Sequence, residues 1–120
     1  MIPFNSIQHL TRLEDLRAVF DFVREHIADD GVFIVDLFNP NLEFLLERGV
    51  RHLQAYSGYP DPDGGGPVRV EETREYDRAR QVNRITWYFR IGGGPERAVG
   101  FDMRVIFPQE LRLLVEHMGF

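Results

Sequence analysis

The sequence contains no cysteine, no lysine and no apolar run long enough to cross a bilayer. The missing cysteine excludes a disulfide framework, a thiolate nucleophile and a cysteine-ligated metal site, and it fits the cytosol. The 14 basic residues are all arginine, and 19 acidic residues outnumber them to give a net charge of −5. Because phosphate binding needs clustered basic residues, this balance argues against a nucleic-acid partner. We therefore expect a cytoplasmic protein that binds neither nucleic acid nor membrane.

The histidines and glycine clusters do not form a metal or phosphate motif. The four histidines are scattered, without the i, i+4 spacing of a metal-binding pair. Residues 61–72 match part of a calcium loop, but Gly65 stands where that pattern needs an oxygen ligand. The Gly triplets at 64–66 and 92–94 lie between predicted strands, whereas a phosphate loop leads into a helix. We interpret both triplets as hairpin loops and expect no metal site.

The first part of the chain predicts a helix, a buried strand and a second helix. Thr11 and Glu14 have the spacing of a capping box, and apolar residues then recur at helical spacing. Residues 32–38 form a nearly continuous apolar run, which predicts a strand buried on both faces, as in parallel sheets. Asn39 is predicted to cap a short helix that begins at Pro40.

The remainder of the chain changes to a period of two. Residues 68–77, 82–91 and 98–107 predict three long strands, and residues 52–57 predict a shorter one. Their short connections predict an antiparallel meander of three to four strands, with one apolar and one polar face. Pro108 is predicted to open a last helix. These elements together predict an α+β fold.

Asp36, Asn39 and His9 are the candidate site residues that follow from the pattern itself. Asp36 is the one acid in the predicted buried strand, and Asn39 follows its end, where ligands bind in open α/β sheets. Asp36 either serves such a site or accepts hydrogen bonds from neighbouring backbone N–H groups, and both interpretations stay open. His9 lies on a loop after the first apolar segment, either as a catalytic base or as a packing residue at the helix entry.

Three segments together resemble the second half of a class I S-adenosylmethionine-dependent methyltransferase: residues 3–10, 13–27 and 30–40. In that family the fourth strand ends in a loop at the methionine end of the cofactor, and a helix and a Gly-led fifth strand follow. Residues 107–120 are similar to the family's next helix, which runs into a sixth strand through Gly-Phe. The antiparallel strands resemble the insertion that covers the acceptor site in small-molecule methyltransferases.

The resemblance implies a division of the single domain, residues 1–120. It comprises a Rossmann-like remnant at 1–50, a lid-like antiparallel sheet at 51–107 and a helix at 108–120. The family's Gly-rich cofactor loop has no counterpart in this sequence. The resemblance therefore implies a truncated relative, inactive alone.

The resemblance also implies roles for individual residues. S-adenosylmethionine, bound in the intact parent and not by this chain alone, would contact Phe4, Asn5 and Ser6. For a small-molecule methyl acceptor, the implied residues are Asn39 and Tyr59 in substrate binding and His9 and Asp36 in catalysis. The alternative is a non-enzymatic module that binds a small molecule or dimerises. Exposed sheet edges lead us to expect a homo-oligomer.

Overall fold

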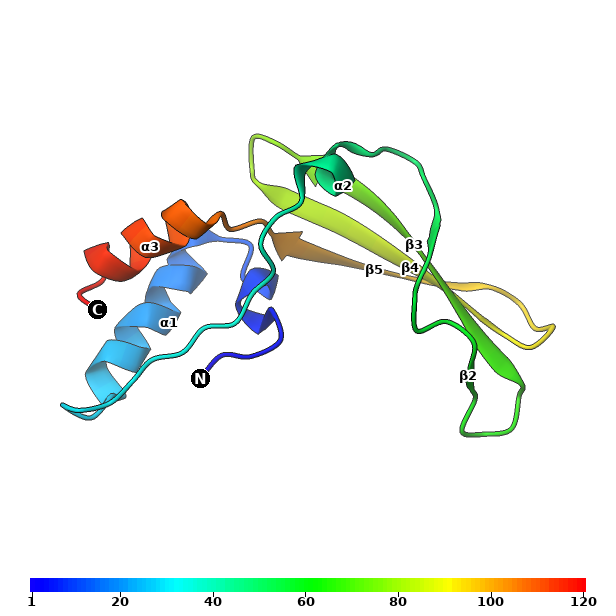
Figure 1. The fold of residues 1–120 in the computed structure, drawn as a ribbon, viewed down its shortest axis with the longest axis horizontal. Coiled ribbons are helices and arrows are strands. Elements are labelled where there is room, and N and C mark those ends of the chain that lie inside the picture. Colours follow the sequence, from blue (N-terminus) through cyan, green and yellow to red (C-terminus); the bar gives the residue numbers. More distant parts are fainter.

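The computed structural model describes residues 1–120, which form a helical part and an antiparallel sheet set end to end (Figure 1). In chain order the elements are the 3-10 helix η1 (Ser6–His9), α1 (Leu13–His26), α2 (Leu42–Leu46), β1 (His52–Leu53), β2 (Tyr59–Pro60), β3 (Pro67–Asp77), β4 (Val82–Ile91), β5 (Arg97–Arg104) and α3 (Pro108–His117). The molecule measures 54 × 33 × 20 Å, and its radius of gyration is 17.7 Å. A compact domain of this length has a radius of about 14 Å, so the chain is distinctly elongated.

The sheet confirms the predicted meander. Its strand order is β1-β3-β4-β5, with β2 paired to the other end of β3, and all of these pairs are antiparallel. The register places Glu72 opposite Trp87 and Ile85 opposite Phe101. Because side chains alternate between faces, these four residues share one face with the apolar side chains of the three long strands. The opposite face carries Arg69, Glu71, Thr73, Arg84, Thr86, Tyr88, Arg90 and Asp102.

The core lies between α1, α3 and the segments that connect them to the sheet. Its buried members are Ile7, Leu16, Phe20, Ile106 and Met118. Leu16 and Phe20 lie one turn apart on the predicted apolar side of α1, which is the spacing that brings two side chains onto one helix face. Leu13, predicted on the same side, is 54% exposed at the first residue of the helix.

The prediction that residues 32–38 form a strand buried on both faces is wrong. They are extended, but they form only one parallel bridge, between Val35 and Ile2. The residues that pack against the core are Phe33, Val35 and Leu37. The alternate residues are exposed: Val32 at 78%, Ile34 at 51% and Phe38 at 72%. The physical reason is that α1 and α3 cover one side of this segment, while no element of the chain covers the other.

The short helix α2 begins two residues later than predicted. Its N-cap is Asn41, whose Oδ1 accepts a 2.9 Å hydrogen bond from the Glu43 N–H. Asn41 has the extended backbone of an N-cap, with φ of −95° and ψ of 111°, and its side chain pairs one of the free N–H groups of the first turn. The helix therefore starts after Asn41, while Asn39 and Pro40 stay in the preceding irregular segment.

The helical part and the sheet are joined by a buried arginine at the end of β5. Arg104 is 7% exposed, and its Nη2 and Nε donate to the Thr11 carbonyl oxygen at 2.7 and 3.2 Å. This contact holds the end of the sheet against the loop that leads into α1. It thereby positions η1 next to β5.

Candidate functional site

A cleft of about 910 Å³ lies between the apolar face of the sheet and two segments of the helical part. One wall comes from the loop and η1, through residues 4–9, and another from residues 38–45 around α2. Figure 1 shows α2 lying over β3, while η1 lies beside the end of β5. The floor is formed by side chains of β3, β4 and β5.

The floor of the cleft contains a buried carboxylate, that of Glu72. Glu72 is only 5% exposed, although most of its neighbours on this face are apolar. The Trp87 indole Nε1 donates a 2.6 Å hydrogen bond to Glu72 Oε2, and Arg74 Nε donates to Oε1. Both carboxylate oxygens are therefore paired, which a buried charge requires.

Two buried amides lie in the same cleft. Asn83 is 8% exposed, and its Oδ1 is fully buried without a hydrogen-bond partner. Gln8, on η1, is 6% exposed and also lines the cleft. A buried polar atom without a partner costs about 1–3 kcal/mol, so Asn83 Oδ1 is an unsatisfied acceptor beside the cleft.

Aromatic rings form the apolar wall. Trp87 packs edge-on against Phe101, with ring centroids 5.0 Å apart, and Tyr56 lies 6.4 Å from Trp87. The His9 ring lies 5.9 Å from Phe101. Burial, and secondly the nearby charge of Glu72, raise the pKa of Tyr56 above its ordinary value. These rings offer a flat apolar surface beside the polar floor.

The structure brings four of the predicted site residues to this cleft: Phe4, Asn5, His9 and Asn39. Asn5 has a left-handed backbone with φ of 59°. Its N–H donates to the Asp36 carbonyl oxygen at 3.1 Å, and its Oδ1 accepts the Phe38 N–H at 2.6 Å. These bonds hold the loop of residues 4–9 against the extended segment at 32–38.

Three other predicted residues do not line the cleft. The Ser6 hydroxyl donates to the Pro3 carbonyl oxygen at 2.5 Å, which is a local turn contact. Asp36 Oδ2 accepts a 3.2 Å hydrogen bond from the Phe4 N–H. This is the second of the two roles that the sequence left open for Asp36, namely accepting a hydrogen bond from a neighbouring backbone N–H. Tyr59 lies in β2 opposite Val68, apart from the cleft residues.

Glu72, Arg74 and Asn83 are cleft residues that the sequence reasoning missed. The signal was present, because Glu72 and Arg74 continue the alternation of Val70, and Asn83 continues that of Ile85. In the sequence alone, these three residues look like isolated polar residues on an otherwise apolar strand face. Their proximity depends on the β3–β4 register, which the sequence pattern did not supply.

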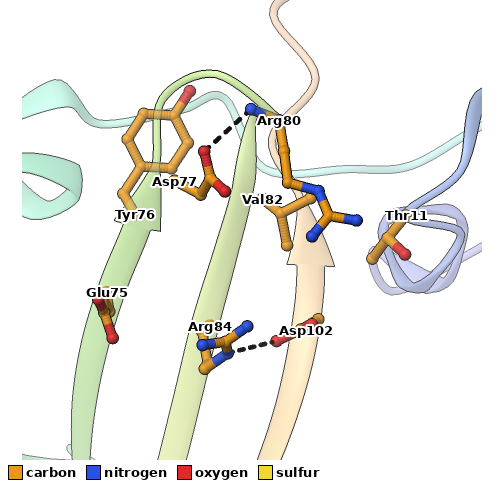
Figure 2. A pocket seen from close by; sticks show the side chains of 8 residues that line it. All are labelled: Thr11, Glu75, Tyr76, Asp77, Arg80, Val82, Arg84 and Asp102. Atoms are coloured by element: carbon orange, nitrogen blue, oxygen red, sulfur yellow. Dashed lines mark hydrogen bonds and ion pairs between the residues drawn. The ribbon is translucent and has the colours of Figure 1, made fainter.

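A second, smaller depression of about 230 Å³ lies at the end of the sheet near the β3–β4 turn. Figure 2 shows its charged lining, in which Arg84 pairs with Asp102 and the Asp77 carboxylate accepts the Arg80 N–H. The Arg84–Asp102 pair is exposed, and such pairs contribute little binding or stability. We interpret this depression as a solvated polar surface.

Two further features bear on the class of site. No group of three or more His, Asp or Glu side chains lies close enough together to hold a metal ion. None of the helices has the length and apolar character needed to cross a membrane.

The fold is similar to a solved structure, the CcbJ methyltransferase from Streptomyces caelestis, with a TM-score of 0.76 and 19% sequence identity. The match covers 97% of this chain and 46% of that chain, so this chain spans less than half of its neighbour's length. The sequence matches no family model and no curated protein. The chain thus has a methyltransferase-like fold, which confirms the resemblance at the level of architecture.

Proposed function

We propose that this chain is the acceptor-binding part of a class I S-adenosylmethionine-dependent methyltransferase that acts on a small molecule. One observation carries the proposal: the loop residues Phe4, Asn5 and His9 line the same cleft as the aromatic face of the sheet. By resemblance, the loop is one edge of a cofactor site, and the sheet is the cover of an acceptor site. The methyltransferase-like fold supports this assignment.

The residues of this chain could contact one edge of S-adenosylmethionine, but they do not form the rest of its binding site. Two hydrogen bonds of Asn5 hold the loop of residues 4–9 against the extended segment at 32–38. A Gly-rich phosphate-type turn between a strand and a helix is absent from these 120 residues. We therefore infer that the chain alone is inactive and holds S-adenosylmethionine only together with further sequence.

The chain's contribution to methyl transfer is to position the acceptor. S-adenosylmethionine, when bound, would supply an electrophilic methyl group for a nitrogen, oxygen or carbon acceptor. The aromatic wall and the amides of the cleft hold the acceptor and exclude water, and positioning of this kind supplies much of the rate. His9, on the wall beside Phe101, is the candidate to take the proton that the acceptor releases.

The test is a calorimetric titration with S-adenosylmethionine. The chain alone is expected to give no micromolar binding. The genomic sequence upstream of Met1 is then read for a strand, a Gly-rich loop and a helix, and the segment that carries them is co-expressed with the chain. Micromolar binding by the resulting complex supports the proposal. Micromolar binding by the chain alone, or a complex that does not bind, contradicts it.

The alternative is a non-enzymatic binding or dimerisation module, and one observation favours it. A strip of apolar side chains is exposed along the two extended segments, and its members are Met1, Phe4, Val32, Ile34 and Phe38. Exposed apolar strips and unpaired strand edges promote association. Under this alternative we expect a homodimer or larger assembly by light scattering at tens of micromolar, and a monomer counts against it.

A further inference from the structure

Arg74 has hydrogen-bonding capacity that the protein does not use. Its Nε donates to Glu72, and its guanidinium lies 5.1 Å from the Phe44 ring centroid of α2. Neither terminal nitrogen, Nη1 nor Nη2, donates to a protein atom. An arginine side chain has five N–H donors in a planar fork that matches a carboxylate. Arg74 and Phe44 both line the cleft.

Glu72 holds this fork in a defined orientation. It stands two residues before Arg74 on the same face of β3, and it is itself held by the hydrogen bond from Trp87. Glu72 is only 5% exposed and each of its oxygens already accepts a hydrogen bond, so it is poorly placed to meet a cationic ligand. The other residues that line the cleft include no Asp, Glu, Lys or Arg. Arg74 is therefore the group that offers free charge-assisted hydrogen bonds there.

Asn83 supplies a second polar contact next to Arg74. It lies two residues along β4 from Ile85, the cross-strand partner of Arg74, so Asn83 and Arg74 are diagonal neighbours on one face. Of its side-chain amide only Oδ1 is fully buried without a partner, so the NH₂ group is the accessible end and can donate to an anion. The rings of Trp87 and Phe101 lie beside this pair and suit the apolar body of a ligand.

We propose that the cleft binds a carboxylate-bearing small molecule, with the carboxylate on the terminal nitrogens of Arg74 and on the Asn83 amide. Glu72 is a positioning residue in this site. That the molecule is a methyl acceptor rests on the proposed function, whereas carboxylate recognition does not. Carboxylate-bearing small molecules are thus the substrate class that we assign to this cleft.

The experiment compares three probes with one aromatic body and different head groups: phenylacetate, phenylacetamide and phenethylammonium. Trp87 is the only tryptophan of the chain and lies in the cleft, so its fluorescence reports binding directly. We expect phenylacetate to bind about tenfold more tightly than phenylacetamide, because hydrogen bonds to a charged group are stronger. Phenethylammonium is expected to bind weakest. Equal affinity for the three probes, or a preference for the cation, overturns the proposal.

Substitutions then assign the preference to Arg74. Arg74→Gln is expected to reduce the ratio of phenylacetate to phenylacetamide affinity to about one, and Arg74→Lys to retain part of it, because lysine keeps the charge and loses the fork. Arg84→Gln, on the opposite face of the sheet, is the matched control and should leave the ratio unchanged. An unchanged ratio in Arg74→Gln overturns the proposal. If Arg74→Gln does not fold, the wild-type comparison of probes still decides.

The probe titrations and the cofactor titration test the two proposals independently. The probe titrations need no cofactor, so a carboxylate preference without cofactor binding by the co-expressed complex supports this inference and a non-enzymatic binding module. Cofactor binding without a carboxylate preference supports the methyltransferase and overturns this inference.

Discussion

Trp87 and Glu72 face each other across the β3–β4 register, and the indole Nε1 donates a 2.6 Å hydrogen bond to the carboxylate Oε2. This contact makes it possible for a charged side chain to lie on the apolar face of the sheet. With Arg74 on the other oxygen, the carboxylate has a donor on each side. The three residues form one hydrogen-bonded unit, and its Arg74 lines the cleft with both terminal nitrogens unpaired.

The first prediction concerns this unit. Glu72→Gln is expected to lower the free energy of unfolding by about 1–3 kcal/mol, because the amide leaves one buried donor of Trp87 or Arg74 without an acceptor. Glu75→Gln is the matched control, since Glu75 is on the same strand, exposed and in no ion pair. That change is expected to stay within about 0.5 kcal/mol. Urea unfolding measures both, and equal effects contradict the assigned role of Glu72.

The second prediction concerns the core. Phe20 is 0% exposed and makes edge-to-face contacts with Phe33 and Phe120, with ring centroids 5.6 and 6.0 Å apart. Phe20→Ala is expected to cost about 3–5 kcal/mol, the usual range for a large buried ring. Phe22→Ala, in the same helix but 61% exposed, is expected to cost less than about 1 kcal/mol. Urea midpoints with helix content by circular dichroism check the difference, and similar losses speak against this core.

The third prediction concerns the loop at the cofactor edge. Asn5→Gly keeps access to the left-handed backbone and removes the hydrogen bond to the Phe38 N–H, which costs about 1 kcal/mol. Asn5→Ala loses the hydrogen bond and also the easy access to the left-handed backbone, so it is expected to lower the free energy of unfolding by about 1 kcal/mol more. Hydrogen exchange should show faster exchange of the Phe38 amide in both variants. Undiminished protection in Asn5→Gly contradicts the contact.

The fourth prediction concerns pH. Burial and the charge of Glu72 raise the pKa of Tyr56 above its ordinary value of 10.0. As pH rises past about 10, the unfolded chain loses this proton before the folded chain does, so stability falls through the interval up to the folded pKa. Tyr56→Phe, which cannot ionise, should therefore lose less stability above pH 10, with little change in slope between about pH 7 and 9. Urea midpoints across this range measure the effect. Parallel pH profiles of the two proteins contradict it.

Local pattern was sufficient to predict the sheet. Ile85 and Trp87 alternate with Arg84 and Thr86 along β4, and this alternation alone assigns the faces. The turns between β3, β4 and β5 are short, so antiparallel pairing of neighbours follows from the chain order. The helix α1 was predictable for the same reason, because the spacing of Leu16 and Phe20 is a property of consecutive residues.

The local sequence pattern did not predict the burial of the segment at 32–38 correctly. Its apolar run is compatible with burial on both faces, and yet Val32 and Phe38 are exposed. Burial depends on which elements cover a segment, and a run of residues carries no information about its neighbours in space. The placement of Asp36 follows the same logic, because its bond to the Phe4 N–H needs two segments 32 residues apart to dock.

The amino-acid sequence thus predicted the order of most elements and the two faces of the sheet, because these depend on neighbouring residues, and its ordered segments carried the resemblance to a methyltransferase that the structural comparison supports as a fold. The composition of the cleft was settled by the tertiary structure alone. Arg74 and Asn83 meet through the strand register, and Gln8 joins them through the packing of η1 beside β5. Contacts between distant parts of a chain are determined by docking, and these contacts define the site.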